Sequence, residues 1–144
     1  LPLIQSQLLK IFRHLFFNFG NFNLKVCNFC VHCININDSD YAGIYGHDVC
    51  CIYACASVGN LYYQVHYKGG KWLPEVKNRE DYAGIYNKPI DGFMIKSDIK
   101  QLTYRVHLRR TNKWLPWVTG YNQNDSTNGY AGILGQEIDA IQIK

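Results

Sequence analysis

An internal repeat constrains the possible folds of this chain more than any other feature of its sequence. Residues 40–45 (Asp-Tyr-Ala-Gly-Ile-Tyr) recur letter for letter as residues 81–86, and a shorter copy follows at residues 130–134. The tyrosines that precede the three Ala-Gly pairs are 41 and 48 residues apart. A period of this length is typical of folds built from equivalent units, so we expect three units here.

Two further motifs precede the repeated segment in its second and third copies, namely Tyr-x-Val-His and then Lys-Trp-Leu-Pro. They occupy residues 63–66 and 71–74 in one copy and residues 104–107 and 113–116 in the other. An Ile-Asp pair within an apolar run follows the repeated segment in both copies. The order of these matches defines unit two as residues 59–100 and unit three as residues 101–144.

The first unit, residues 29–58, is degenerate. Residues 29–32 (Phe-Cys-Val-His) are taken as the counterpart of Tyr-x-Val-His, but the interval from this motif to Tyr41 is seven residues shorter than the one in unit two. No Lys-Trp-Leu-Pro strand is expected in this unit. Residues 1–28 are unassigned, although the spacing of their apolar residues favours a leading helix.

Apolar and polar residues alternate within the two well-preserved units, as they do in strands with one buried face. Tyr63 and Val65 share one face of such a strand, and Tyr104 and Val106 do the same in unit three. The aromatic content of 15% also favours strands. We therefore predict an all-β domain whose units close around a pseudo-threefold axis, as in a β-trefoil, with a three-sheet β-prism as the alternative.

The order of the motifs resembles the clostridial hydrophobic-tryptophan (ChW) repeat. It is still more similar to the repeats that follow the catalytic domains of Firmicute peptidoglycan hydrolases, such as N-acetylmuramoyl-L-alanine amidases and lysozyme-like endolysins. Residues 104–144 carry the fullest match, including Trp114 and Trp117. Residues 63–96 match well, although Glu75 occupies the place of the second tryptophan. The resemblance covers a little over half of the chain.

This resemblance implies an extracellular, non-catalytic module that binds cell-wall glycan, with a covalently linked catalytic domain upstream. An adhesion module that contacts another surface protein is the alternative. The net charge of +4 is too low to make nucleic acid the expected partner. No apolar stretch approaches the roughly 20 residues that span a bilayer. The sequence carries no metalloprotease, serine-hydrolase or phosphate-loop motif, so we predict no catalytic centre and no cofactor.

The three tryptophans are the first candidates for contact with a sugar, because an indole ring can stack on the apolar face of a pyranose. Trp72 and Trp114 recur at equivalent positions, which also suits a core role, and the pattern favours the core slightly. Trp117 has Glu75 as its counterpart. A core position rarely exchanges tryptophan for a charge, so we expect Trp117 to be exposed and to contact ligand.

Six polar or aromatic residues complete the candidate ligand-binding set. The two histidines should lie on the outer sheet face, where a structural hydrogen bond is about twice as plausible as a ligand contact. The aspartates either accept backbone N–H bonds at a turn or accept hydroxyl protons from a sugar. The tyrosines that precede Ala-Gly are expected as half-buried walls of a shallow groove. These residues are His66, His107, Asp91, Asp139, Tyr82 and Tyr130.

All six cysteines fall in the first part of the chain, three of them as Cys-x-x-Cys-x-x-Cys at residues 27–33. This spacing suits thiolate ligands of zinc, with His32, His47 or a later cysteine completing the site. Disulfides are equally compatible with it, and buried or incidental thiols are favoured over both. We therefore assign no metal site.

Overall fold

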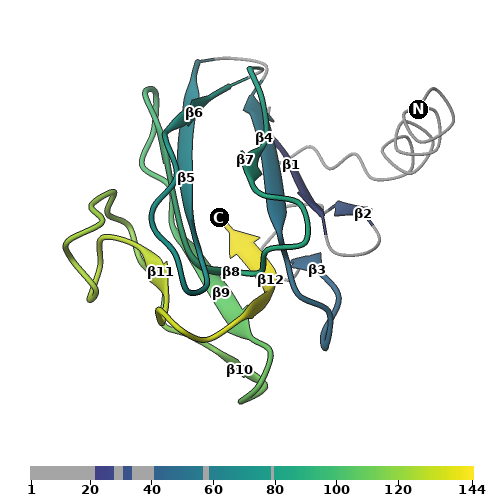
Figure 1. Cartoon of the computed structure of the whole chain (residues 1–144). Coiled ribbons are helices and arrows are strands. Elements are labelled where there is room, and N and C mark those ends of the chain that lie inside the picture. The colour runs from purple at the N-terminus through teal and green to yellow at the C-terminus, as the bar shows by residue number, and fades with distance from the viewer. Residues whose placement is uncertain (1–21, 28–30, 34–40, 57–58, 79) are drawn as a thin grey trace, which may run out of the picture.

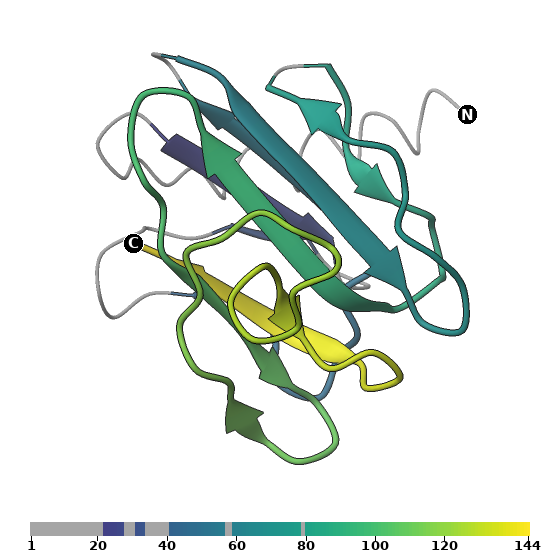
Figure 2. The same ribbon diagram turned by 90° about the vertical axis from the view of Figure 1, so that its left-hand side faces the viewer.

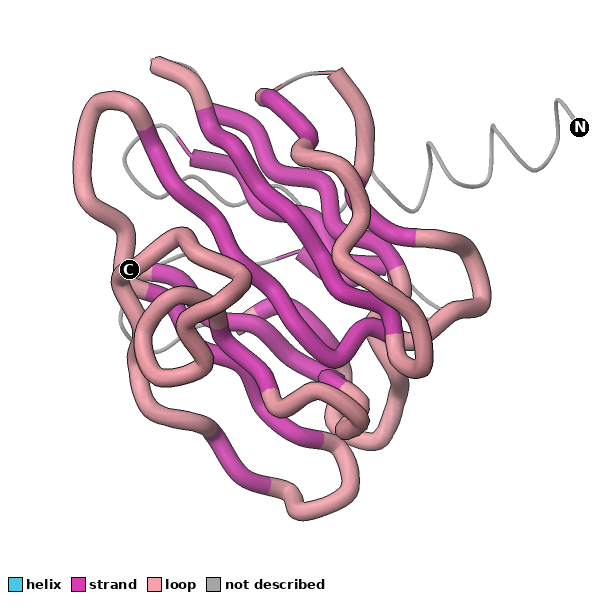
Figure 3. The backbone as a smooth tube through the Cα atoms, turned by 60° about the vertical axis from the view of Figure 1, so that its left-hand side comes forward, coloured by secondary structure: helices cyan, strands magenta, loops and turns pink. Residues whose placement is uncertain are grey.

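The computed structural model describes residues 22–27, 31–33, 41–56, 59–78 and 80–144, the first two segments by their backbone alone. All regular elements in these residues are β-strands (Figure 3), which confirms the predicted all-β class. The leading helix predicted near the N-terminus lies outside the described residues.

The strands form three four-stranded antiparallel sheets, each built around one central pair of long strands (Figure 1). The central pairs are β1 (Phe22–Cys27) with β4 (Cys51–Ala56), β5 (Leu61–Tyr67) with β8 (Ile90–Ser97), and β9 (Tyr104–Leu108) with β12 (Ile138–Ile143). The first strand of each pair also carries a short edge strand. These edge strands are β2 (Val31–Cys33), β6 (Val76–Lys77) and β10 (Lys113–Trp114).

The fourth strand of every sheet is an Ala-Gly pair contributed by another unit. β7 (Ala83–Gly84) joins β4, β11 (Ala131–Gly132) joins β8, and β3 (Ala42–Gly43) joins β12. Each unit therefore completes the sheet of the unit before it, and unit one completes the sheet of unit three. The pairing forms a closed cycle, as three equivalent units require.

The glycine of the repeated Ala-Gly pair is required by close backbone approach. At Gly132 the backbone has φ 133°, and a Cβ atom would lie 2.2 Å from the carbonyl oxygen of Asp91. Gly43 and Gly84 have nearly the same φ, and each would meet a carbonyl oxygen of its neighbouring strand at 2.1 Å. Only glycine accepts this conformation without a clash, which explains why the motif recurs unchanged.

Unit one begins earlier than residue 29, so the predicted boundary is wrong. Cys27 pairs with Cys51 in β4 as His66 pairs with Gly92 and as His107 pairs with Ala140. The counterpart of Tyr-x-Val-His is therefore the end of β1, whose sequence is Leu-Lys-Val-Cys. Its alternation of apolar and polar residues survives, but its motif letters do not. For this reason the comparison of motifs selected residues 29–32.

The short second strand of unit one is present as well, although its tryptophan is not. Val31 in β2 pairs with Cys27, as Trp114 in β10 pairs with His107. The interval from Val31 to Tyr41 is ten residues, the same as the interval from Trp72 to Tyr82. Unit one thus keeps all four strands and differs mainly in a shorter first hairpin.

The core lies between the three sheets and contains the residues that the alternating pattern assigned to it. Tyr63, Val65, Tyr104 and Val106 are fully buried. The Tyr104 ring meets Phe93 edge-on at 5.5 Å, and its hydroxyl donates to the carbonyl oxygen of Gly120 at 2.7 Å. Figure 2 shows the long strands of two sheets side by side, with the loop that precedes β11 in front of them.

Candidate functional site

Side chains that could bind a ligand gather where an Ala-Gly strand joins the sheet of the preceding unit. We call these places seams and name each by its long strand. The β12 seam joins β3 to β12, the β8 seam joins β11 to β8, and the β4 seam joins β7 to β4. Two of the three seams carry a histidine, an aspartate and a tryptophan.

At the β12 seam, a buried histidine–aspartate pair fastens unit one to unit three. His107 Nδ1 lies 2.5 Å from Asp139 Oδ1, and Asp139 Oδ2 accepts the backbone N–H of Gly46 at 2.8 Å. The histidine is 3% exposed and the aspartate 1%. A carboxylate only accepts hydrogen bonds, so the tautomer of His107 that suits this contact carries its proton on Nδ1. One carboxylate therefore satisfies donors from two units.

The β8 seam repeats this arrangement between units two and three. His66 Nδ1 lies 2.5 Å from Asp91 Oδ1, and Asp91 Oδ2 accepts the N–H of Gly135 at 2.7 Å. Both side chains are buried. The structure shows a hydrogen-bonded histidine and an aspartate that accepts a backbone N–H, as in the structural roles considered for these residues, and their ligand-binding roles stay predictions. Sequence reasoning did not foresee that the two side chains bond to each other.

Partly exposed aromatic rings cover the histidine at the β12 seam. The Tyr45 ring stacks on His107 with centroids 4.2 Å apart, and Tyr41 stacks on Tyr45 at 4.9 Å with an interplanar angle of 4°. Trp114 meets His107 edge-on at 5.3 Å, and its indole N–H donates to the Tyr45 hydroxyl at 3.0 Å. Tyr41 and Tyr45 are 38% and 44% exposed. Burial, followed by the neighbouring Tyr45, raises the pKa of Tyr41. These rings form a fixed aromatic surface that is open to solvent.

The β8 seam is more closed. Trp72 contacts His66 edge-on at 5.5 Å and Tyr130 at 5.2 Å. Tyr130 is buried, deeper than the half-buried wall that we predicted. Leu134 stands where the repeat has Tyr45, so this seam lacks the equivalent of the tyrosine ring that stacks on His107. Trp72 and Trp114 are both half-buried. Trp72 packs against the hydrophobic core, and Trp114 packs against His107 of the buried histidine–aspartate pair.

The β4 seam lacks the histidine, the aspartate and the tryptophan. By register, Cys27, Cys50 and Val31 occupy their places. Tyr82 and Tyr86 at this seam are 53% and 68% exposed, so Tyr82 is more exposed than predicted. The side chains of the cysteines at residues 27–33 lie outside the described part of the chain. Within the described part, no three His, Cys, Asp or Glu side chains are grouped as metal ligands.

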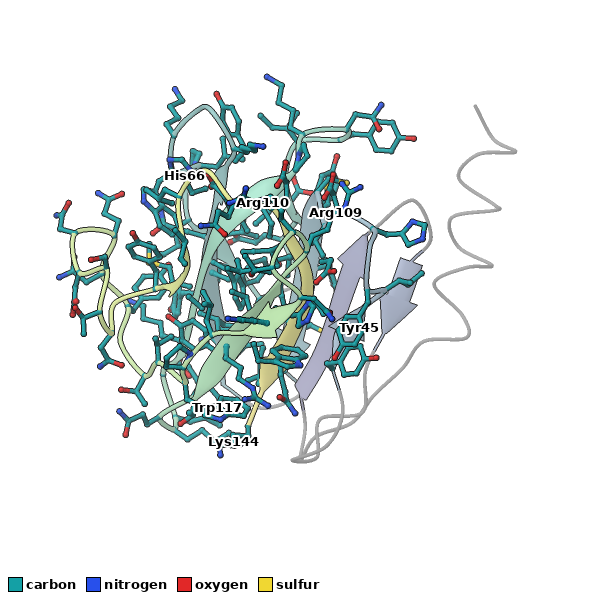
Figure 4. All side chains as sticks on the ribbon, turned by 90° about the horizontal axis from the view of Figure 1, so that it is seen from below. Tyr45, His66, Arg109, Arg110, Trp117 and Lys144 are labelled. Carbon is teal, nitrogen blue, oxygen red and sulfur yellow. The ribbon has the colours of Figure 1, made fainter. Side chains whose placement is uncertain are left out.

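Trp117 belongs to a row of rings and cations that extends from the β12 seam across the outer face of the same sheet. The Arg105 guanidinium lies 4.8 Å from the Trp114 centroid and 4.3 Å from the Trp117 centroid. The Lys144 ammonium lies 4.3 Å from the Trp117 centroid, and Figure 4 shows these two side chains together at the end of β12. Trp117 is half-buried, less open than predicted, because two cations pack on it.

The equivalent row on the β5–β8 sheet contains a carboxylate, which the described residues of the row on the β9–β12 sheet do not. Glu75 replaces Trp117 and accepts a hydrogen bond from the Tyr121 hydroxyl at 2.6 Å. Lys96, the counterpart of Lys144, lies 4.5 Å from the Tyr121 centroid. Burial and the nearby Glu75 carboxylate raise the pKa of Tyr121. Tyr121, from the loop of unit three, therefore supplies the ring beside Lys96, as Trp117 supplies the ring beside Lys144.

Sequence reasoning missed Tyr41, Tyr45 and Arg105 as members of the site. The repeat itself contained a signal for Tyr41, since it is the equivalent of Tyr82 and Tyr130. What the repeat could not reveal is that unit one meets unit three. Tyr45 and Trp114 are 69 residues apart in the chain and yet share a hydrogen bond.

Comparisons of the chain with protein-family models, with curated proteins and with solved structures found no match. The described part of the chain contains no helix with the length and apolar character needed to cross a bilayer.

Proposed function

We propose that this chain is a non-catalytic module that binds cell-wall carbohydrate outside the cell and accompanies a peptidoglycan hydrolase such as an N-acetylmuramoyl-L-alanine amidase. The observation that carries this proposal is the β12 seam. There the rings of Tyr41, Tyr45 and Trp114 are held in fixed contact with one another while two of them remain open to solvent.

A sugar-binding surface needs an apolar platform for the C–H face of the pyranose and polar groups for its hydroxyls. The stacked tyrosines supply the platform, and their hydroxyl groups can donate and accept hydrogen bonds. The contacts of Tyr45 with His107 and Trp114 hold the platform in place before ligand arrives. Little conformational entropy is then lost on binding, which favours affinity.

The repeated organisation supports binding to a polymer. Aromatic side chains are present at all three seams, although their surroundings differ. Weak sites that engage one glycan strand together raise the effective concentration of the module at the wall. The resemblance of residues 63–144 to repeats of peptidoglycan hydrolases agrees with this task, and the partner enzyme would be a covalently linked domain upstream.

We also infer that the fold is a three-sheet β-prism rather than the β-trefoil first considered. Four strands per unit suit both plans. The three separate sheets favour the prism, because among the described strands no long strand pairs with a long strand of another unit.

The direct test is binding to purified Gram-positive cell walls by Tyr45→Ala, with Tyr86→Ala as the matched control. Tyr45 and Tyr86 are the same residue of the repeat, but only Tyr45 is held by a histidine and a tryptophan. We expect Tyr45→Ala to weaken binding about tenfold, as expected for loss of a fixed aromatic anchor, and Tyr86→Ala, which removes a weaker contact at the β4 seam, to weaken it far less. Thermal melts of both variants establish that they remain folded. Equal binding by the wild type and Tyr45→Ala would contradict the proposed site.

Competition with soluble wall fragments separates this function from the alternative of a protein-binding adhesion module. Fragments of the glycan should displace the module from the wall if it binds carbohydrate. If binding survives saturating fragments but is abolished by protease treatment of the wall, the partner is a surface protein.

A further inference from the structure

Two cations on the outer face of the β9–β12 sheet, Arg105 and Lys144, have no partner of opposite charge among the described residues. The ion pairs of the described residues join Lys68 to Glu137, Arg109 to Asp48, and the two histidines to their aspartates. No described carboxylate lies within ion-pair distance of Arg105 or Lys144. Arg105 donates from Nε to the neutral Gln142 side chain at 2.9 Å, and its terminal amino groups make no hydrogen bond to the described residues.

These two cations pack on the same ring. Arg105 and Lys144 each lie 4.3 Å from the Trp117 centroid, so they are separated by no more than twice that distance. Arg105 also packs against Trp114. Contacts of this kind fix long, flexible side chains and lower the entropy lost when a ligand binds. A fixed guanidinium with free terminal N–H groups is suited to a carboxylate or a phosphate.

The equivalent place on the β5–β8 sheet supplies an internal comparison. There Gln64 replaces Arg105 and Glu75 replaces Trp117. The Tyr121 ring lies between this carboxylate and the ammonium of Lys96, since it bonds to the first and contacts the second. Glu75 therefore supplies an anion to that row, whereas no described carboxylate forms an ion pair with Arg105 or Lys144 in the equivalent row of the β9–β12 sheet.

We infer that Arg105, Lys144 and Trp117 form a binding site for an anionic group of the wall glycan, either a carboxylate or a phosphate. This inference rests on the proposed function and specifies its ligand class. The aromatic platform of the β12 seam lies on the same sheet face and is continuous with this site through Trp114. One acidic glycan strand could then place a sugar ring on the tyrosines and its anion beside Arg105.

The test compares Arg105→Gln, which installs the residue found in unit two, with Lys96→Gln on the other sheet as the control. Three soluble probes are titrated: a neutral N-acetylglucosamine oligomer, a muramic-acid-containing glycan with free carboxylates, and a phosphate-bearing wall polymer. We expect Arg105→Gln to lose about tenfold or more in affinity for one of the acidic probes and to bind the neutral oligomer as the wild type does. Binding of that acidic probe should also become less sensitive to salt. Lys96→Gln should behave as the wild type with all three probes.

Lys144→Gln provides a second variant at an exposed position, where misfolding is not expected, and should reduce the same affinity several-fold. The acidic probe that responds identifies the carboxylate or the phosphate as the ligand. If the wild type binds neutral and acidic probes equally and both variants match it, the anion site is refuted while glycan binding stands. If the wild type binds none of the three probes, the proposed function itself is refuted.

Discussion

Replacing Asp139 by alanine should destabilise the domain strongly, because this side chain joins unit one to unit three from a buried position. The carboxylate accepts one hydrogen bond from His107 and one from the backbone of Gly46. The alanine variant leaves both donors without an acceptor at a site where Asp139 is 1% exposed. Water does not reach such a position readily, so each donor bears the cost of its lost partner.

The magnitude follows from the two bonds. A buried hydrogen bond to a charged group contributes roughly 1.5–3 kcal/mol, so the pair predicts a loss of about 3–5 kcal/mol in the free energy of unfolding. Asp139→Asn retains one acceptor oxygen and should lose about half as much. A domain of this size has a free energy of unfolding of about 5–15 kcal/mol. The alanine variant therefore keeps a measurable stability or falls close to the point at which the domain no longer folds.

Urea unfolding followed by tryptophan fluorescence measures this loss, since Trp114 packs against the same histidine. Asp91→Ala is the internal replicate, because Asp91 makes the equivalent bonds at the β8 seam. Asp48→Ala removes a carboxylate from a partly exposed ion pair and should have a much smaller effect. A change of less than about 1 kcal/mol for both Asp139→Ala and Asp91→Ala would refute the role of these pairs in closing the units.

Two further predictions concern backbone approach and high pH. Gly132→Ala should lower the free energy of unfolding by more than about 3 kcal/mol, because the new Cβ collides with a carbonyl oxygen. Gly135→Ala has open space at its Cβ position and should lose only about 1–2 kcal/mol, from the strain of a positive φ. Equal losses of unfolding free energy in the two variants would argue against the pairing of β11 with β8. Burial raises the pKa of Tyr63 to about 12, so the neutral side chain makes its full contribution to the free energy of unfolding below pH 10. That contribution is lost as the pH rises from 10 through 12, by about 2–3 kcal/mol in total. Unfolding measured from pH 9 to pH 12 should show a shallower decline for Tyr63→Phe, and an unchanged slope would contradict this assignment.

Much of the local structure could be predicted from the repeat and its alternation. The positions of Tyr63 and Val65 in the core follow from a period of two, because successive side chains in a strand point to opposite faces. Unit one was misplaced because β1 retains the alternating pattern without the motif letters. In such a strand hydrophobicity is preserved by packing, while residue identity is free to change.

The site was predicted less completely than the strands. Trp72 and Trp114 were recognised as recurring ring positions, and acceptance of backbone N–H groups was one of the two roles that the sequence left open for the aspartates. The contacts of Trp117 with Arg105 and Lys144 could not be foreseen, because these residues are far apart in the sequence: Arg105 lies in β9, Trp117 follows β10 and Lys144 follows β12. Whether an aromatic ring is open or covered depends on neighbours that the pattern of one unit does not identify.

The amino-acid sequence by itself determined the strand character of the chain and the number of units, since these depend on local alternation and on periodicity, whereas the need for glycine after each repeated alanine comes from the close approach of a strand of another unit. Only the tertiary structure decided which unit completes which sheet. That choice brings Tyr41 and Tyr45 of the first unit onto Trp114 and His107 of the last one. The physical reason is that a sheet edge can accept any compatible strand, and the closed packing of all three units around one core selects the partner.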